Sequence, residues 1–188
     1  MVTTKLNINM KYLRFLIMAF VLFFVSSCFW EDLWTWLNPD DKCTIQQRYY
    51  EGDNLRIDGF YYRDVSENDE STQIFILYGN GVVMAPGGTK LSDIDNKIKN
   101  LINNNLRRDE IDMWGLFEVE DSMISLEYYL PSMYGHHTYL MRGIILNDTT
   151  FQMTEGRWSV DSKEESINHL YRFRKTEAKP DSTNKFFM

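Results

Sequence analysis

Two adjacent histidines and three clustered glutamates are the residues of this sequence whose types and spacing come nearest to a metal-binding or catalytic pattern. His136 and His137 are residues that metals favour, but neighbouring residues of a strand point to opposite faces of its sheet. No carboxylate or cysteine stands at ligand spacing beside them, and a structural zinc site needs further ligands. We therefore predict that the histidine pair lies in an exposed loop, directly after 131–135, and holds no metal.

The glutamates allow a second hypothesis, because paired carboxylates hydrolyse glycosidic bonds. Glu118 and Glu120 share one face of a predicted strand, and Glu127 lies on the next strand. The same pattern is typical of the solvent side of a half-exposed sheet, which is the interpretation that we adopt. The sequence holds neither a G-x-S-x-G nucleophile elbow nor a phosphate loop with its Lys and Ser/Thr. We predict no catalytic residue, no cofactor and no enzymatic activity.

Length and composition describe one acidic globular domain. The 188 residues are 44% hydrophobic, 25% charged and 15% aromatic, and aromatic residues favour strands. The net charge of −7 disfavours a phosphate-binding surface for nucleic acid, so no nucleic-acid partner is expected.

Residues 1–27 have the pattern of a targeting segment. Three basic residues precede an apolar run at 15–25, which is too short for a membrane-spanning helix. The Ser26-Ser27-Cys28 sequence that follows resembles the lipobox of bacterial lipoproteins, with Val25 where that family usually has Leu. The resemblance implies cleavage before Cys28 and its acylation, for example with palmitate. An uncleaved anchor and ordinary secretion are the alternatives.

Cleavage and acylation at this position would change the cysteine count and the net charge. Only Cys43 would remain as a thiol, so no intramolecular disulfide forms, and we predict a small buried hydrophobic residue at that position. Loss of the three basic residues of the targeting segment takes the net charge from −7 to −10.

Residues 28–53 are predicted to be a membrane-proximal tether. At helical spacing, Trp30, Leu33, Trp34 and Leu37 share one face. Trp30, Trp34 and Leu37 either contact the membrane interface, which tryptophan favours, or cap an open end of the folded domain.

Residues 54–175 are predicted to form an antiparallel β-domain, with a tail at 176–188. Short apolar and aromatic runs predict strands at about 55–65, 72–78, 81–85, 113–120, 122–130, 138–146, 149–155 and 168–174. Leu91, Ile94, Ile98, Leu101 and Ile102 repeat at helical spacing and predict one inserted amphipathic helix. The fold class is thus mainly β, a meander or barrel of about eight strands, with an α+β sandwich as the alternative.

Several turn and strand motifs resemble those of lipocalin-like lipoproteins of Gram-negative bacteria. They are Gly59-Phe60-Tyr61-Tyr62, Phe75 to Gly81, Trp114-Gly115, Gly143 to Phe151, Tyr171-Arg172-Phe173 and Lys179 to Asn184. The resemblance implies a lipocalin-like barrel in the cell envelope, lipid-anchored to the outer membrane on its periplasmic or outer face. It carries no catalytic residue. The helix between the third and fourth strands departs from lipocalins, whose main helix follows the barrel.

Two functions follow from these patterns. The first is binding of a small apolar ligand or a partner envelope protein by the barrel. The ligand-facing or core residues would then be Tyr61, Ile74, Ile76, Tyr78, Trp114 and Phe151. The second is a structural or interaction module of the outer membrane, with a filled core and no small-molecule ligand.

Overall fold

The computed structural model describes residues 41–64, 71–104, 108–132, 135–161 and 163–187. The predicted targeting segment, the lipidation site Cys28 and the membrane-contact residues Trp30, Trp34 and Leu37 lie outside the described residues. Of the helices that the described residues form, none has the length and hydropathy needed to cross a bilayer.

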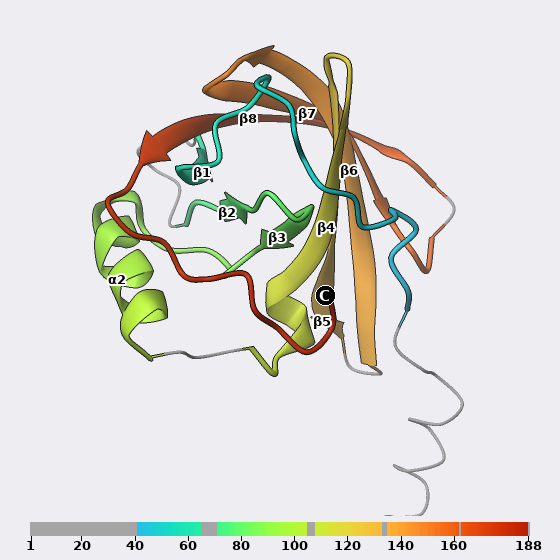
Figure 1. Ribbon diagram of the computed structural model, residues 1–188. Helices are drawn as coiled ribbons and strands as arrows, with labels where there is room; N and C mark the ends of the chain where they lie inside the picture. The colour runs from blue at the N-terminus through green and yellow to red at the C-terminus, as the bar shows by residue number, and fades with distance from the viewer. Residues whose placement is uncertain (1–40, 65–70, 105–107, 133–134, 162, 188) are drawn as a thin grey trace, which may run out of the picture. The chain divides into compact units, whose positions relative to one another are not determined.

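Eight strands form one closed antiparallel barrel in chain order (Figure 1). They are β1 (Gly59–Arg63), β2 (Ile74–Leu77), β3 (Val82–Met84), β4 (Trp114–Glu120), β5 (Met123–Ser132), β6 (Gly135–Asn147), β7 (Thr150–Trp158) and β8 (Glu165–Lys175). The first and last strands pair from Gly59↔Lys175 to Arg63↔Tyr171, which closes the barrel. The predicted eight-stranded antiparallel fold is confirmed, and the barrel is closed.

Short turns join the strands at one end of the barrel, which we call the Asp121 end. Asp121 has a positive φ of 54° between β4 and β5, a conformation that Asp adopts more readily than most residues. Gly81 has a φ of 79° before β3, and a Cβ there would lie 2.1 Å from the Arg48 carbonyl oxygen. A side chain at this turn would therefore collide with the segment that crosses it.

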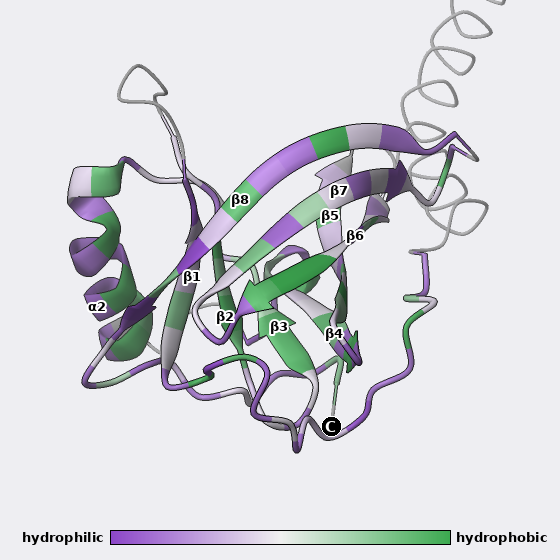
Figure 2. Cartoon of the chain, turned by 90° about the horizontal axis from the view of Figure 1, so that it is seen from above, coloured by the Kyte–Doolittle hydropathy of each residue, from purple (hydrophilic) through white to green (hydrophobic). Residues whose placement is uncertain are grey.

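Each face of the barrel wall carries an apolar cluster. The inner cluster takes residues from all eight strands, including Tyr61, Phe75, Phe117 and Phe151. The outer cluster takes alternate residues of β1 to β4, together with the helix α2 (Ile94–Asn104). The wall at β2 and β3 is therefore buried on both sides, and Figure 2 shows β3 as hydrophobic throughout.

The predicted helix covers the outer cluster. A 3-10 turn, η1 (Leu91–Asp93), leads into α2, and Ile94, Ile98 and Leu101 of α2 are buried against the barrel wall. A second 3-10 turn, η2 (Ile111–Met113), leads into β4. The helix lies beside β1 with its hydrophobic and hydrophilic residues on different sides (Figure 2).

Residues 41–54, which we call the strap, cross the outside of the barrel. The strap begins at β6, where the Asp41 N–H donates to the His136 carbonyl oxygen over 3.1 Å. It then passes over β5 and β4 and reaches the turn before β3, where the Tyr50 N–H donates to the Gly79 carbonyl oxygen over 2.8 Å. The strap therefore ties together strands that are distant in sequence.

Glu127 holds the strap to the barrel. Its Oε2 accepts hydrogen bonds from the Thr44 N–H (2.6 Å), the Thr44 hydroxyl (2.9 Å) and the Ile45 N–H (2.9 Å). Its Oε1 accepts one from the Thr138 hydroxyl (2.8 Å), and the residue is 1% exposed. The predicted solvent-side position of Glu127 is therefore wrong. Strand alternation correctly places it on the outer face, but the strap covers that face.

The C-terminal residues 176–187 also pack on the outer face. The Lys179 ammonium donates to the carbonyl oxygens of Ile57 (2.5 Å) and Leu77 (3.0 Å) and lies 4.6 Å from the centre of the Tyr78 ring. The Tyr78 hydroxyl donates to the Pro180 carbonyl oxygen over 2.9 Å. The predicted tail is therefore part of the outer layer that covers β2.

Glu127→Ala should destabilise the fold by about 2–4 kcal/mol, because the backbone N–H groups of Thr44 and of the buried Ile45 lose their acceptor. Glu120→Ala, at an exposed glutamate of β4, is the matched control and should change the free energy of unfolding by less than about 0.5 kcal/mol. Urea unfolding followed by fluorescence measures both values. Equal stability of the two variants would contradict the role given to Glu127.

Candidate functional site

The structure divides the six predicted core residues between two places. Tyr61 and Phe151 lie inside the barrel, and their ring centres are 4.9 Å apart. The other four residues belong to the outer cluster under α2: Ile74, Ile76, Tyr78 and Trp114. All six are buried. Only Tyr61 and Phe151 therefore line the interior, where a barrel holds a ligand.

A continuous series of aromatic rings occupies much of the interior. The Phe151 ring stacks on the Tyr171 ring at 5.0 Å, and the Tyr171 ring lies 5.2 Å from that of Phe75. Phe75 meets Tyr128 edge-on at 5.3 Å, and Tyr128 meets Tyr139 at 6.2 Å. Such contacts stabilise the interior beyond the burial of ring area alone. We call these rings, together with Tyr61, the aromatic column.

Polar side chains replace apolar ones towards the other end of the barrel, where β1 ends at Arg63. We call this the Arg63 end, and the interior group there the polar layer. Its members come from β1, the residue before β2, β5, β6 and β8: Arg63, Gln73, Tyr128, Tyr139, Glu165, His169 and Tyr171. Each position follows from strand alternation, since Arg63 is two residues beyond Tyr61 and His169 is two residues before Tyr171.

Hydrogen bonds order most of the polar layer. The Gln73 amide donates to the Tyr128 hydroxyl and accepts from the Tyr171 hydroxyl, each over 2.6 Å. The Tyr139 hydroxyl donates to a Glu165 carboxylate oxygen. That hydroxyl passes over Gly156, where a Cβ would lie 2.0 Å from the Tyr139 oxygen. Gln73 thus fixes two tyrosines, and the absence of a side chain at Gly156 leaves space for the third.

Two buried atoms of the polar layer have no hydrogen-bond partner. They are Arg63 Nε and His169 Nδ1, and they are the only such buried side-chain N and O atoms among the residues that the structure describes. An unpaired buried polar group costs about 1–3 kcal/mol. Native proteins pair nearly all such groups, often through bound water or an ion. The coincidence of both atoms in one layer therefore marks a place for a missing partner.

Burial and nearby charges shift the pKa values of His169 and Tyr128 in the polar layer. Burial lowers the pKa of His169, the Arg63 guanidinium lowers it further, and Glu165 partly opposes them. Burial raises the pKa of Tyr128 to about 12, although the bond to Gln73 and the charge of Arg63 oppose the increase. At neutral pH the layer therefore holds one guanidinium, a neutral imidazole and protonated tyrosines.

The histidine pair does not behave as expected from the sequence. His136 and His137 lie on β6 instead of in an exposed loop, and both are half-buried. His137 Nδ1 lies 2.9 Å from Asp41 Oδ2, and the Ser159 hydroxyl donates to the same oxygen. Partial burial raises the pKa of Asp41, but these two bonds outweigh it and the net pKa is lowered.

This Ser159–Asp41–His137 set is not a catalytic triad, because the serine bonds the carboxylate instead of the histidine. Within the described part of the chain, no group of three or more His, Cys, Asp or Glu residues is arranged to hold a metal ion. Asp41 therefore joins the start of the strap to β6 and to Ser159.

Cys43 belongs to the strap and is half-buried, whereas the sequence predicted a buried hydrophobic residue at this position. Burial, followed by the charge of Glu127, raises the pKa of its thiol to about 12. The thiolate that a nucleophilic cysteine needs is thus suppressed at neutral pH.

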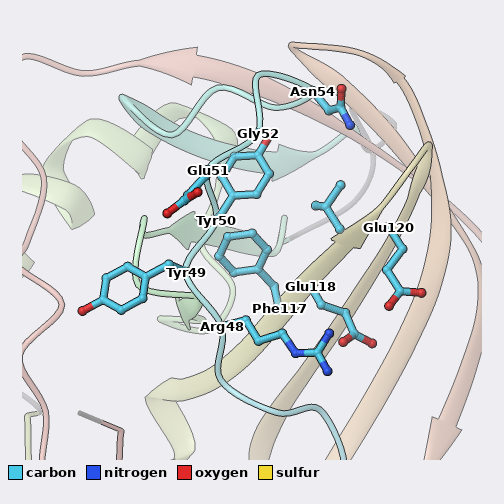
Figure 3. A pocket seen from close by; sticks show the side chains of 10 residues that line it. Arg48, Tyr49, Tyr50, Glu51, Gly52, Asn54, Phe117, Glu118 and Glu120 are labelled. Atoms are coloured by element: carbon cyan, nitrogen blue, oxygen red, sulfur yellow. The ribbon is translucent and has the colours of Figure 1, made fainter.

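Two hollows flank the strap, one beside Phe117 of the inner cluster and one on the outer face of the barrel. One has a volume of about 180 Å³ and lies between strap residues 48–54 and β4 (Figure 3). The rings of Tyr50 and Phe117 face one another inside it at 5.7 Å, while Tyr49 is 79% exposed. The other hollow, of about 390 Å³, lies between strap residues 44–48 and strands β4 to β7.

The sequence matches no protein-family model, and it has no significant match among curated proteins or solved structures. Sequence reasoning missed Arg63, Gln73 and His169, although the alternation that begins at Tyr61 and Tyr171 points to the first and the last.

Arg63→Gln should raise the pKa of His169, because it removes a nearby positive charge while burial remains. Folding lowers this pKa, so the contribution of His169 to stability is complete above about pH 6.5 and is lost as the pH falls through the folded value. NMR titration of the imidazole gives the pKa, and Arg172→Gln, on the outer face of β8, is the control. An unchanged pKa of His169 in Arg63→Gln would contradict the polar layer as described.

Proposed function

We propose that this chain is a non-enzymatic, lipid-anchored envelope protein whose lipocalin-like barrel binds a small organic acid at the polar layer. The single observation that carries the proposal is the pair of unpartnered buried atoms, Arg63 Nε and His169 Nδ1. The sequence favoured a small apolar ligand or a partner protein. The polar layer instead favours a ligand that carries an acidic group.

An acid suits these atoms because carboxylate and phosphate oxygens accept hydrogen bonds from both. A guanidinium binds such groups through several N–H donors in one plane. His169 joins it as a donor in the tautomer that carries its proton on Nδ1, or when it is protonated. A bound anion would oppose the effect of Arg63 on His169, so binding should raise the pKa of His169.

The aromatic column limits the size of the ligand. The rings of Phe75 and Phe151 are fully buried and contact the Tyr171 ring of the polar layer, so little space remains for a long chain below Arg63. Tyr128 and Tyr171 are held by Gln73 and frame the layer. A compact acid with a short apolar part is therefore the ligand that fits this interior.

A second candidate is an interaction module with a filled core and a partner protein in the envelope. The aromatic column favours it, because a barrel filled in this way serves as a rigid scaffold. The hollows beside the strap would then be part of the contact surface. This candidate predicts that no small molecule accompanies the purified protein.

The tether supports a place at the membrane surface. The strap begins at Asp41, which is bonded to His136 and His137 at the Arg63 end of the barrel. From Cys28 to Asp41 the extended chain spans at most about 45 Å. Acylation of Cys28 would therefore tether the barrel to a membrane, and the resemblance to lipocalin-like lipoproteins favours the outer membrane.

Native mass spectrometry of the full chain, extracted gently from its own membrane, tests the binding function. We expect an extra mass that is lost on denaturation, and at least about a tenfold lower occupancy in Arg63→Gln, since a charged hydrogen bond contributes about 1.5–3 kcal/mol. Arg172→Gln, whose guanidinium is paired with Asp64, is the matched control and should keep the extra mass. A bare mass for the unmodified protein would favour the interaction module instead.

The denatured mass of the same sample tests the anchor. Acylation predicts the mass of residues 28–188 plus that of its acyl chains, and Cys28→Ser should lose both the added mass and the membrane association. A mass that includes residues 1–27 would contradict cleavage before Cys28, while leaving the function of the barrel open.

A further inference from the structure

The arginines of the described chain fall into two groups. Four of them hold a carboxylate oxygen within 3.0 Å: Arg56, Arg108, Arg172 and Arg174. The other four have no such close carboxylate among the described residues. Arg63 belongs to the polar layer, and the remaining three, Arg48, Arg142 and Arg157, line one and the same hollow on the outer face. Carboxylates outnumber basic groups in this acidic chain, so three arginines without a close carboxylate in one hollow mark a candidate anion-binding site.

The hollow, which we call the arginine groove, is assembled from distant parts of the chain. Arg48 comes from the strap, Arg142 from β6 and Arg157 from β7. Ser125 of β5 is the register partner of Arg142 on the neighbouring strand, and it adds a neutral hydroxyl to the lining. The groove has a volume of about 390 Å³, which is room for a small polyatomic anion with its water.

Three carboxylates face or border the groove. Glu118 lines it, but no ion pair joins Glu118 to the arginines among the residues that the structure describes. Glu164 lies 4.0 Å from Arg142, and Glu155 is the register partner of Arg142 on β7. The lining itself thus holds three guanidiniums and one carboxylate, an excess of positive charge that a bound anion would balance.

We propose that the arginine groove binds a phosphate group. Three guanidiniums that line one hollow suit a tetrahedral, multiply charged anion, which accepts several planar forks of N–H donors at once. The groove is separate from the polar layer, because it lies on the outside of the barrel wall whereas Arg63 lies inside. The phosphate group comes either from a free anion or from the headgroups of the membrane near the strap.

Binding of inorganic pyrophosphate to the full chain in an uncharged detergent is the first test. The Nε–H signals of Arg142 and Arg157, followed by NMR, should shift on titration. Arg142→Gln and Arg157→Gln should each weaken binding by about tenfold, in keeping with the loss of a charge-assisted hydrogen bond. Arg174→Gln, an outer-face arginine that is paired with Asp95, is the matched control and should leave binding within about twofold.

Vesicles of zwitterionic phospholipid, with and without an anionic phospholipid, distinguish the two sources. Binding to anionic vesicles that pyrophosphate displaces, and that Arg142→Gln loses, supports a headgroup phosphate. Binding of pyrophosphate without a preference for anionic vesicles supports a free anion. If Arg142→Gln and Arg157→Gln bind pyrophosphate and anionic vesicles as well as Arg174→Gln does, the proposal is overturned. Loss of pyrophosphate binding in Arg63→Gln but not in Arg142→Gln would place the anion in the polar layer and would overturn the proposal for the groove.

Unchanged thermal unfolding of Arg142→Gln and Arg157→Gln shows that any lost binding does not come from a lost fold. Both side chains lie on the outer face, Arg142 with half of its side chain exposed, so the substitutions leave the interior intact.

Discussion

Pairing of β1 with β8 is the constraint on which the rest of the structure depends. Once Arg63 is paired with Tyr171 and Gly59 with Lys175, every strand has an inner and an outer face. An eight-stranded barrel has an interior just wide enough for side chains to fill. Here large rings fill it, as in the stack of Phe151 on Tyr171. The outer face of the same wall then needs its own cover, which α2, the strap and the C-terminal residues provide.

The polar layer follows from the same closure. Alternation brings residues of five segments to one height inside the barrel, where polar groups must pair with one another or with a ligand. Gln73 forms hydrogen bonds with the hydroxyls of two tyrosines, and Glu165 accepts one from a third. Arg63 and His169 keep one unpaired buried nitrogen each. Under the proposed function, a bound acid supplies both of these hydrogen bonds.

Periodicity predicted the elements well because strands and helix bury one face in a regular pattern. It could not separate inside from outside at β2, where Ile74 and Ile76 on one face and Phe75 and Leu77 on the other are all buried. Glu127 was placed in solvent because its cover, the strap, is more than eighty residues away in sequence. The unpaired state of Arg63 and His169 depends on three-dimensional neighbours, which no local pattern contains.

A high-resolution structure of the protein purified from its own membrane tests the central claim most directly. The account predicts non-protein density beside the polar layer, with an acidic oxygen within hydrogen-bond distance of Arg63 Nε and of His169 Nδ1. Ordered water alone, or a protein carboxylate that pairs with both nitrogens, would contradict it, and the barrel would then be a filled scaffold.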